Sequence, residues 1–158
     1  MNSPPFIVHA SDVPEEAGSY PAPFDKEQLS FGRNLGKAAG SVNIGMWHER
    51  IPPGRRTSFT HAHSHEEELI YVLEGACMIR IAEPGKEPYE ITVRTGHTIS
   101  FPAGTGIAHS AINRGTEDCT LLCFGERKPS VDRALYTDEV EYQKWALANR
   151  PERTWTGR

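Results

Sequence analysis

Residues 60–75 read THAHSHEEELIYVLEG and combine two histidines, a run of glutamates and an apolar stretch. His61 and His63 are two residues apart, so on a strand both side chains point to the same face. Glu68 opens the apolar stretch that leads to Gly75, which predicts a second strand carrying a carboxylate. The segment therefore predicts two imidazoles and one carboxylate close together, which is the donor set of a metal site.

A second segment, residues 96–113, reads GHTISFPAGTGIAHSAIN and supplies another histidine. His109 follows a loop marked by Pro102, Gly104 and Gly106, so its strand begins after a turn. In a small barrel of antiparallel strands this histidine can lie beside the first pair. We therefore predict one metal ion bound by three imidazole nitrogens and one carboxylate oxygen. The predicted metal ligands are His61, His63, Glu68 and His109.

Residues close to these positions leave alternatives open. Glu67 competes with Glu68 as the carboxylate, but Glu68 shares a face with Ile70 and keeps the spacing to the turn glycine. His65 has the parity of a ligand yet lies where the chain turns, so we expect a rim residue within possible reach of ligand or substrate. His97 is expected to be a solvated turn residue. The alternative to the whole set is a barrel without metal, whose histidines only form hydrogen bonds.

The two segments together resemble the two motifs of the cupin family. The first motif reads glycine, His-x-His, a glutamate after four residues and a glycine after six more, and it is matched by Gly54, His61, His63, Glu68 and Gly75. The second motif reads glycine, Pro-x-Gly, histidine and an asparagine after three residues, and it is matched by Gly96, Pro102, Gly104, His109 and Asn113. The gap between the loop glycine and the histidine is four residues here, where the usual pattern has two, which predicts a longer loop beside the site.

The resemblance covers about residues 41–126 and implies an all-β fold, the cupin double-stranded β-helix, which is a jelly-roll-like barrel. The residue pattern agrees with this fold, because short alternating stretches are separated by turn signals such as EPGKEP and NRGTED. Besides the alternating stretch VNIGMWHE, the expected strands lie at 58–63, 68–73, 76–81, 90–94, 98–101, 107–113 and 119–125. The expected organisation is an N-terminal arm at 1–40, the barrel at 41–126 and a C-terminal tail with one helix at 127–158.

The two ends of the chain need their own interpretation. The arm is rich in proline, glycine and charge and shows little periodicity. In the tail, the stretch TDEVEYQKWALANR places Val140, Lys144 and Leu147 at helical spacing. Asp138 and Glu141 form the expected capping pair of this helix. Because a short barrel has open strand edges, we expect a homodimer in which the subunits exchange arms to cover them, and the resemblance supports this, since cupins are often dimers.

Length, charge and hydropathy restrict the class of protein. A chain of 158 residues is long enough for one compact core and too short for two comfortable domains. The net charge of -4 and the pI near 6.0 argue against a nucleic-acid partner or an anionic membrane. No apolar run is long enough to cross a membrane, and the N-terminal stretch MNSPPFIVHA lacks the features of a signal peptide. We expect a soluble, cytoplasmic protein with a small-molecule ligand.

The three cysteines, Cys77, Cys119 and Cys123, are an odd count and predict no framework of disulfides. Cys119 and Cys123 share a face of one expected strand, where their Cα atoms lie about 13 Å apart, beyond the limit of about 7 Å for a bridge. We expect free cysteines that behave as small buried apolar residues, which is consistent with a reducing compartment.

The strand VNIGMWHE gives the candidate catalytic residue. His48 shares a face with Ile44 and Met46 and would look into the barrel if that face is the inner one. It is then either a core histidine with satisfied hydrogen bonds or a proton carrier for catalysis. The expected substrate pocket is lined by Met46, Phe59, Ile70, Val72, Ile107 and Ala111. Such an apolar lining suits a small, partly apolar or aromatic molecule that offers oxygen atoms to the metal.

The predicted ligand set restricts the chemistry without choosing the reaction. Nitrogen and oxygen donors suit one divalent transition-metal ion, namely manganese, iron, nickel, cobalt or zinc. Four protein ligands leave positions open for water or substrate, as a catalyst requires. The resemblance implies a metal-dependent enzyme of the dioxygenase, decarboxylase, isomerase or lyase type, or else a non-catalytic protein that binds or senses a small molecule. A second charged group near the open positions would favour the enzyme, and a wholly apolar cavity would favour the binding protein.

Overall fold

The computed structural model describes residues 4–157, and most of its regular structure is antiparallel strand. The strands in chain order are β1 (Glu16–Ala17), β2 (Phe31–Asn34), β3 (Ile44–Ile51), β4 (Ala62–His63), β5 (Glu68–Glu74), β6 (Ala76–Ala82), β7 (Tyr89–Arg94), β8 (Thr98–Phe101), β9 (Ala108–Ile112), β10 (Cys119–Glu126) and β11 (Ala134–Leu135). The α-helices are α1 (Leu35–Ala38) and α2 (Val140–Asn149), and the 3-10 turns are η1 (Ala10–Asp12) and η2 (Pro151–Arg153).

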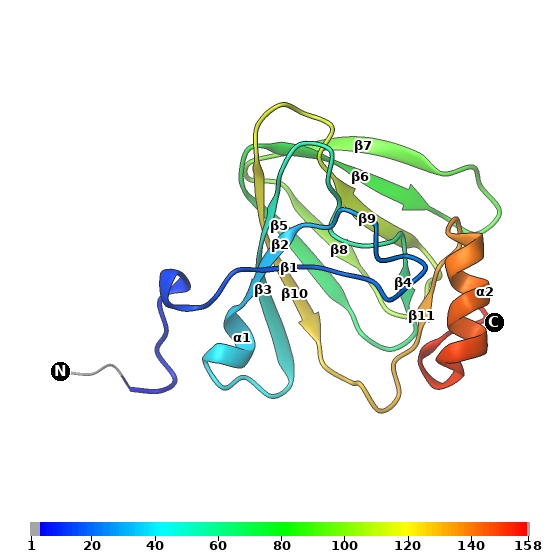
Figure 1. Cartoon of the computed structure of the whole chain (residues 1–158), viewed down its shortest axis with the longest axis horizontal. Helices are drawn as coiled ribbons and strands as arrows, with labels where there is room; N and C mark the ends of the chain where they lie inside the picture. Colours follow the sequence, from blue (N-terminus) through cyan, green and yellow to red (C-terminus); the bar gives the residue numbers. More distant parts are fainter. Residues whose placement is uncertain (1–3, 158) are drawn as a thin grey trace.

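Two sheets face each other and enclose the core. One has six strands in the order β1-β2-β3-β10-β5-β8, the other has three in the order β7-β6-β9, and β4 pairs separately with β11. The core side chains between the sheets are Ile51, Ile70, Val72, Cys77, Ile79, Val93, Phe101, Ala111, Cys119 and Leu121. Figure 1 shows the two layers, with α2 at one end of the barrel. The predicted all-β, jelly-roll-like fold is confirmed, and the three cysteines are free.

The strands β5 to β10 lie close to their predicted positions, because each is an alternating stretch between turn residues. β11 was not predicted. The stretch predicted at 58–63 differs, since only Ala62 and His63 form a strand there. Phe59 turns its ring toward α2, and the residues around it form bends instead of a ladder. His61 still pairs with His109 through an isolated bridge, so the first histidine keeps its place beside the barrel.

β3 presents the opposite face to the interior from the one that we expected. Ile51 lies in the core, and the continuous pairing of β3 with β10 keeps Glu49 and Trp47 on the same inner face. Met46 and His48 alternate with them and therefore lie on the outer face. The prediction that Met46 and His48 look into the barrel is wrong. Because β3 has apolar side chains on both faces, its alternation did not identify the buried one.

The N-terminal segment extends the large sheet of its own chain. β2 pairs with β3, and β1 pairs with β2, so the edge of β3 is covered without a partner subunit. Figure 1 shows the chain after β1 running across the barrel toward α2 before it returns to β2. Tyr20 and Phe24, on this crossing, pack against Tyr142 of α2. The sequence pattern had indicated only an irregular arm.

The C-terminal helix exists as predicted, and its buried face is the one that carries Tyr142 and Ala146. α2 places Tyr142 and Ala146 against Phe59, while Val140 and Leu147 are exposed. The aromatic contacts at this interface determine which face of the helix is buried. The spacing of Val140, Lys144 and Leu147 indicated only that a helix forms. The expected capping pair is also wrong, because the N-cap residue is Glu139, without a side-chain cap, and Asp138 instead accepts a hydrogen bond from Arg80 at 2.6 Å. Between residues 4 and 157, no helix has the length and apolar character needed to span a membrane.

Candidate metal centre

Two histidine rings approach each other at the mouth of the barrel. His61 Nε2 and His63 Nε2 are 3.1 Å apart. The Nδ1–H of His61 donates to the carbonyl oxygen of Phe59 at 2.8 Å, and the Nδ1–H of His63 donates to the carboxylate of Asp132 at 2.7 Å. Each neutral ring then carries a lone pair on Nε2. Two lone pairs that face each other repel unless a cation or a proton lies between them, so this pair is arranged as metal ligands are.

Glu68 and His109 lie beside this pair. The Oε2 of Glu68, at the start of β5, is 2.9 Å from Nε2 of His109 and 3.9 Å from Nε2 of His63. His109, on β9, is held by stacking on Phe101, with ring centroids 3.5 Å apart. Burial raises the pKa of Glu68, but the hydrogen bond from His109 and the nearby imidazoles lower it more, to about 2. The carboxylate is therefore charged at physiological pH.

The donor set fits one divalent transition-metal ion. Ligand atoms of His61, His63 and Glu68 lie within 4.8 Å of one another, and His109 is in contact with Glu68. Burial, together with the neighbouring histidines, lowers the pKa of His61 to about 3, so this ring is neutral and able to bind a cation. Imidazole nitrogens with a carboxylate oxygen suit manganese, iron, cobalt, nickel or zinc.

The residues that competed for these positions lie outside the group. Glu67 is exposed, with its backbone N–H donating to the carboxylate of Glu126. His65 is exposed and bonds to Ser64, so it is a rim residue. His97 is exposed in the turn between β7 and β8, as expected of a solvated turn histidine.

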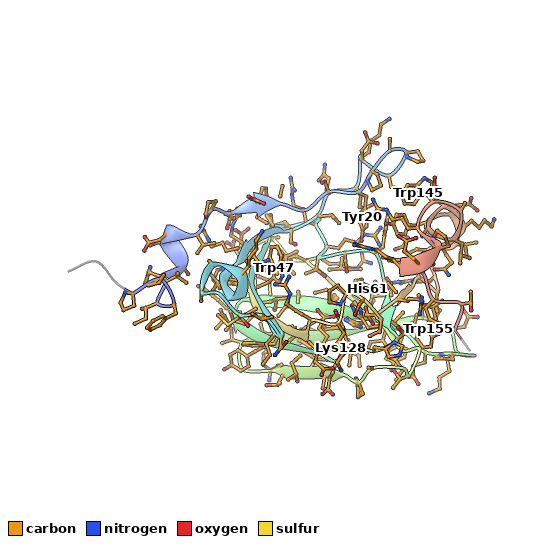
Figure 2. All side chains as sticks on the ribbon, turned by 90° about the horizontal axis from the view of Figure 1, so that it is seen from below. Tyr20, Trp47, His61, Lys128, Trp145 and Trp155 are labelled. Carbon is orange, nitrogen blue, oxygen red and sulfur yellow. The ribbon has the colours of Figure 1, made fainter. Side chains whose placement is uncertain are left out.

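A cavity of about 300 Å³ opens beside three of the four candidate ligands, His61, Glu68 and His109. It is lined by Glu16, Ala17, Gly18, Ser30, Gly32, Trp47, Glu49, Thr57, Ser58, His61, Glu68, Ile70, His109 and Cys123. Six of these residues carry a hydroxyl or a carboxylate, and Trp47 and Ile70 are the large apolar members. Apolar atoms still contribute the larger share of the lining surface, so the lining is mixed, with polar groups that the expected apolar pocket did not include. Figure 2 shows His61 in the interior of the molecule, with Trp47 farther along the barrel and Tyr20 on the segment that covers it.

One of the expected pocket residues, Ile70, lines this cavity. Phe59 does not, because its ring packs on α2. Val72 and Ala111 are fully buried in the core between the sheets, and Ile107 packs against that core. Parity on a strand correctly identified inward side chains, but it did not separate those at the cavity from those that fill the barrel.

Glu49 is the cavity residue with the most distinctive environment. Its Oε2 accepts a hydrogen bond of 2.6 Å from the hydroxyl of Ser30. Burial raises the pKa of Glu49, and the charge of Glu68 raises it further, while the Ser30 hydrogen bond works in the opposite direction. A carboxyl with a raised pKa beside a candidate metal site is typical of a group that exchanges protons with a substrate.

The acid–base role that we assigned to His48 is not supported, because its outer-face position on β3 separates it from the cavity. Its Nδ1 is buried and has no hydrogen-bond partner among residues 4–157. Glu49, the next residue, takes the position that we had given to His48. Ile51, a strongly apolar residue at the end of β3, lies on the same face of the strand as Glu49. This was the sequence signal that could have placed Glu49 on the inner face.

The N-terminal contributors to the cavity had no such signal. Glu16, Ser30 and Gly32 lie in the stretch that the sequence indicated only as an arm. Their place depends on the pairing of β2 with β3, which a local pattern does not encode.

A family model for the cupin domain matches residues 47–125, which is half of the chain. The chain is a cupin. The matched stretch begins at Trp47 and contains the four candidate ligands together with Glu49, while β1, β2 and α2 lie outside it. No match was found among curated proteins.

Solved structures of similar proteins agree with this membership. A sugar phosphate isomerase of the cupin superfamily from Silicibacter pomeroyi is 26% identical, with a TM-score of 0.76, and the similarity covers 84% of this cupin and 82% of that chain. A protein from Acidithiobacillus ferrooxidans, also assigned as a sugar phosphate isomerase, is 27% identical with a TM-score of 0.71, over 85% and 83% of the chains. The polyketide cyclase RemF from Streptomyces resistomycificus is 21% identical with a TM-score of 0.63, over 94% and 98%, and shows the shared fold.

Proposed function

We propose that this cupin is a metal-dependent enzyme that transfers a proton within a small, partly apolar molecule bearing hydroxyl or carbonyl oxygens, as an isomerase or lyase does. The observation that carries the proposal is Glu49, a partly buried carboxyl with a raised pKa in the same cavity as the candidate ligands. A charged group in this place favours an enzyme over a protein that only binds its ligand.

In this proposal His61, His63, Glu68 and His109 hold one ion of manganese, iron, nickel, cobalt or zinc. The bound ion would act as a Lewis acid toward a carbonyl oxygen of the substrate. The carboxylate of Glu49 accepts a proton from the carbon next to that carbonyl, so the C–H bond breaks and its electron pair moves toward the carbonyl. The same carboxyl group then gives the proton to the former carbonyl carbon, while the hydroxyl proton on the first carbon moves to the former carbonyl oxygen, so that the first carbon becomes the new carbonyl.

The remaining lining residues bind and orient the substrate. Thr57 and Ser58 offer hydroxyl groups for its oxygens, and Trp47 offers an apolar surface. Ser30 holds the carboxyl group of Glu49 in one orientation. Glu16 and Glu49 make the lining acidic, which disfavours a phosphate group inside this cavity. The similarity to sugar phosphate isomerases supports the reaction class, and we propose a neutral, oxygen-rich substrate.

The test follows exchange of substrate hydrogen with solvent deuterium by NMR, using hydroxyaldehydes and hydroxyketones with the metal-loaded protein. Elemental analysis of protein purified without added metal identifies the ion, and His109→Ala should lose it. Glu49→Gln should keep the metal and slow exchange by about 10²- to 10⁴-fold, since the amide does not accept the proton. His48→Gln is the matched control, because it changes the adjacent residue on the opposite face of β3 and should exchange as the wild type does.

Three results would contradict the proposal. Equal exchange rates in Glu49→Gln and wild type would remove Glu49 from the chemistry. A molecule that stabilises the wild type in a thermal-shift screen but never exchanges hydrogen would instead identify a binding protein. Stoichiometric metal in His109→Ala would overturn the ligand assignment.

A further inference from the structure

Asp132 lies in the tail beyond the matched cupin domain and contacts the candidate metal centre at Nδ1 of His63, the ring nitrogen that does not face the other candidate ligands. One carboxylate oxygen, Oδ2, accepts the Nδ1–H of His63 at 2.7 Å. The other, Oδ1, accepts the backbone N–H groups of His65 at 2.9 Å and Glu66 at 3.2 Å. The carboxylate therefore bridges a metal ligand and the turn that follows it.

The position of Asp132 is fixed by its own surroundings. Its side chain is only 10% exposed, and its backbone N–H donates to the carbonyl oxygen of Lys128 at 2.8 Å. The next residue, Arg133, is tied to Ser64 by two hydrogen bonds, one from its N–H to the Ser64 hydroxyl and one from the Ser64 N–H to its carbonyl oxygen. β11 then continues the pairing with β4. This stretch of the tail is thus part of the framework that holds His63.

We infer that Asp132 is a positioning residue for the metal centre, one that fixes the tautomer and orientation of His63. A carboxylate that accepts Nδ1–H places the lone pair of His63 on Nε2, the nitrogen that faces His61 and Glu68. It also makes the imidazole a stronger electron-pair donor to a metal ion, as a carboxylate does when it accepts the remaining ring N–H of a histidine ligand. The inference rests on the proposed metal site.

The three candidate histidine ligands differ in the partner of their second ring nitrogen, Nδ1. His61 donates its Nδ1–H to a neutral acceptor, the carbonyl oxygen of Phe59. The Nδ1 of His109 is buried and has no hydrogen-bond partner among residues 4–157. His63 is therefore the ligand whose second nitrogen meets a carboxylate, and its strength as a ligand depends on a residue far away in the sequence.

Glu66 lies near the same carboxylate, so Asp132, Glu66 and His63 could be mistaken for a separate cation site. Both oxygens of Asp132 already accept hydrogen bonds from N–H donors. An ion bound there would displace those donors, whereas the role of a positioning residue uses all of them.

The test titrates Co²⁺ into metal-free protein and records its visible absorption bands, which report both affinity and ligand geometry. In Asp132→Asn, the amide oxygen can still accept a hydrogen bond, but the NH₂ group can only donate. Either the Nδ1–H of His63 or the backbone N–H groups of His65 and Glu66 therefore lose their acceptor. We expect Co²⁺ affinity to fall by about 10- to 100-fold and the absorption bands to shift. Asp118→Asn is the control, because this carboxylate pairs with Arg50 on the surface and should leave both readouts unchanged.

A second measurement does not depend on any variant folding. Nitrogen-15 NMR of the wild-type histidines should show His63 protonated at Nδ1 and not at Nε2. The opposite tautomer, or wild-type affinity and absorption bands in a folded Asp132→Asn, would overturn the inference. Failure of the wild type itself to bind one equivalent of Co²⁺ would overturn the metal site, and the proposed function with it.

Discussion

Glu49 is a cavity residue whose charged form lowers the stability of the folded protein. Its carboxyl is partly buried near the charge of Glu68, and within residues 4–157 it accepts one hydrogen bond, from Ser30, so its charged form is disfavoured. In the unfolded chain the same group is solvated and ionises at an ordinary pKa. The raised pKa in the folded protein therefore lowers the free energy of unfolding once the group must ionise.

This gives a pH-dependent prediction for the metal-free protein. Below the ordinary pKa of a glutamate, Glu49 is protonated in both states and Glu49→Gln should have little effect on the free energy of unfolding. As the pH rises through the raised folded pKa, the wild type loses stability and the variant does not. Glu49→Gln should therefore be the more stable protein at neutral pH, as urea unfolding at pH 4 to 8 would show. A constant difference between the two proteins over that range would contradict the raised pKa.

The sequence predicted the grouping of the candidate metal ligands better than it predicted the residues around them. His61, His63 and Glu68 could be placed together because their spacing follows the two-residue period of a strand and one turn. Glu49 could not, because its strand has apolar residues on both faces and the identity of the inner face is decided by pairing with β10. Asp132 gave no signal, since a lone aspartate after a strand is common in any surface loop.

Among the elements, β2 meets the cavity at Gly32, and this contact can be tested by substituting the glycine. A Cβ atom at Gly32 would lie 2.8 Å from Oε1 of Glu49 and 3.0 Å from Cε3 of Trp47. Gly32→Ala should therefore displace one of these side chains and cost about 1–3 kcal/mol in the free energy of unfolding. Metal content should be unchanged, because the ligands lie on other elements.

Gly45→Ala is the matched control for this prediction. Gly45 lies on the neighbouring strand β3, and the nearest atom to a Cβ there, the carbonyl oxygen of Gly125, is at an ordinary 3.5 Å. Its unfolding in urea should match that of the wild type within about 1 kcal/mol. Equal stability of Gly32→Ala and Gly45→Ala would show that β2 lies farther from Glu49 than described.

The elements divide into those that local sequence specifies and those that packing specifies. β5 to β10 were predictable because turn residues bound each alternating stretch. The helix α2 was predictable as an element, but its buried face was not, since Tyr142 contacts Phe59 and Tyr20 from distant parts of the chain. β1 and β2 are short, and the pairing that makes them strands is with β3 and with each other.

For the whole molecule, we propose a homodimer formed through the outer face of the six-stranded sheet. Ile44 and Leu69 are 57% and 40% exposed there, and Phe124 pairs with Leu69 across the strands. Since the N-terminal segment already covers the edge of β3 within one chain, we expect this face rather than exchanged arms to join the subunits. Leu69→Lys should convert the dimer to a monomer, as light scattering after gel filtration would show.

Ile91→Lys is the control for the dimer, because Ile91 is similarly exposed but lies on β7 in the other sheet. It should leave the mass of the particle unchanged. A monomeric wild type would refute the homodimer outright. Loss of the dimer in Ile91→Lys but not in Leu69→Lys would move the interface to the smaller sheet.

The cavity has two kinds of boundary, and they come from different parts of the chain. The candidate ligand side chains belong to the matched cupin domain, whereas Glu16, Ser30 and Gly32 line the cavity from the N-terminal segment. This separation allows the chemistry and the choice of substrate to diversify independently. Grafting the stretch 16–32 from one cupin onto another is then a route to altered selectivity in which the metal ligands stay untouched.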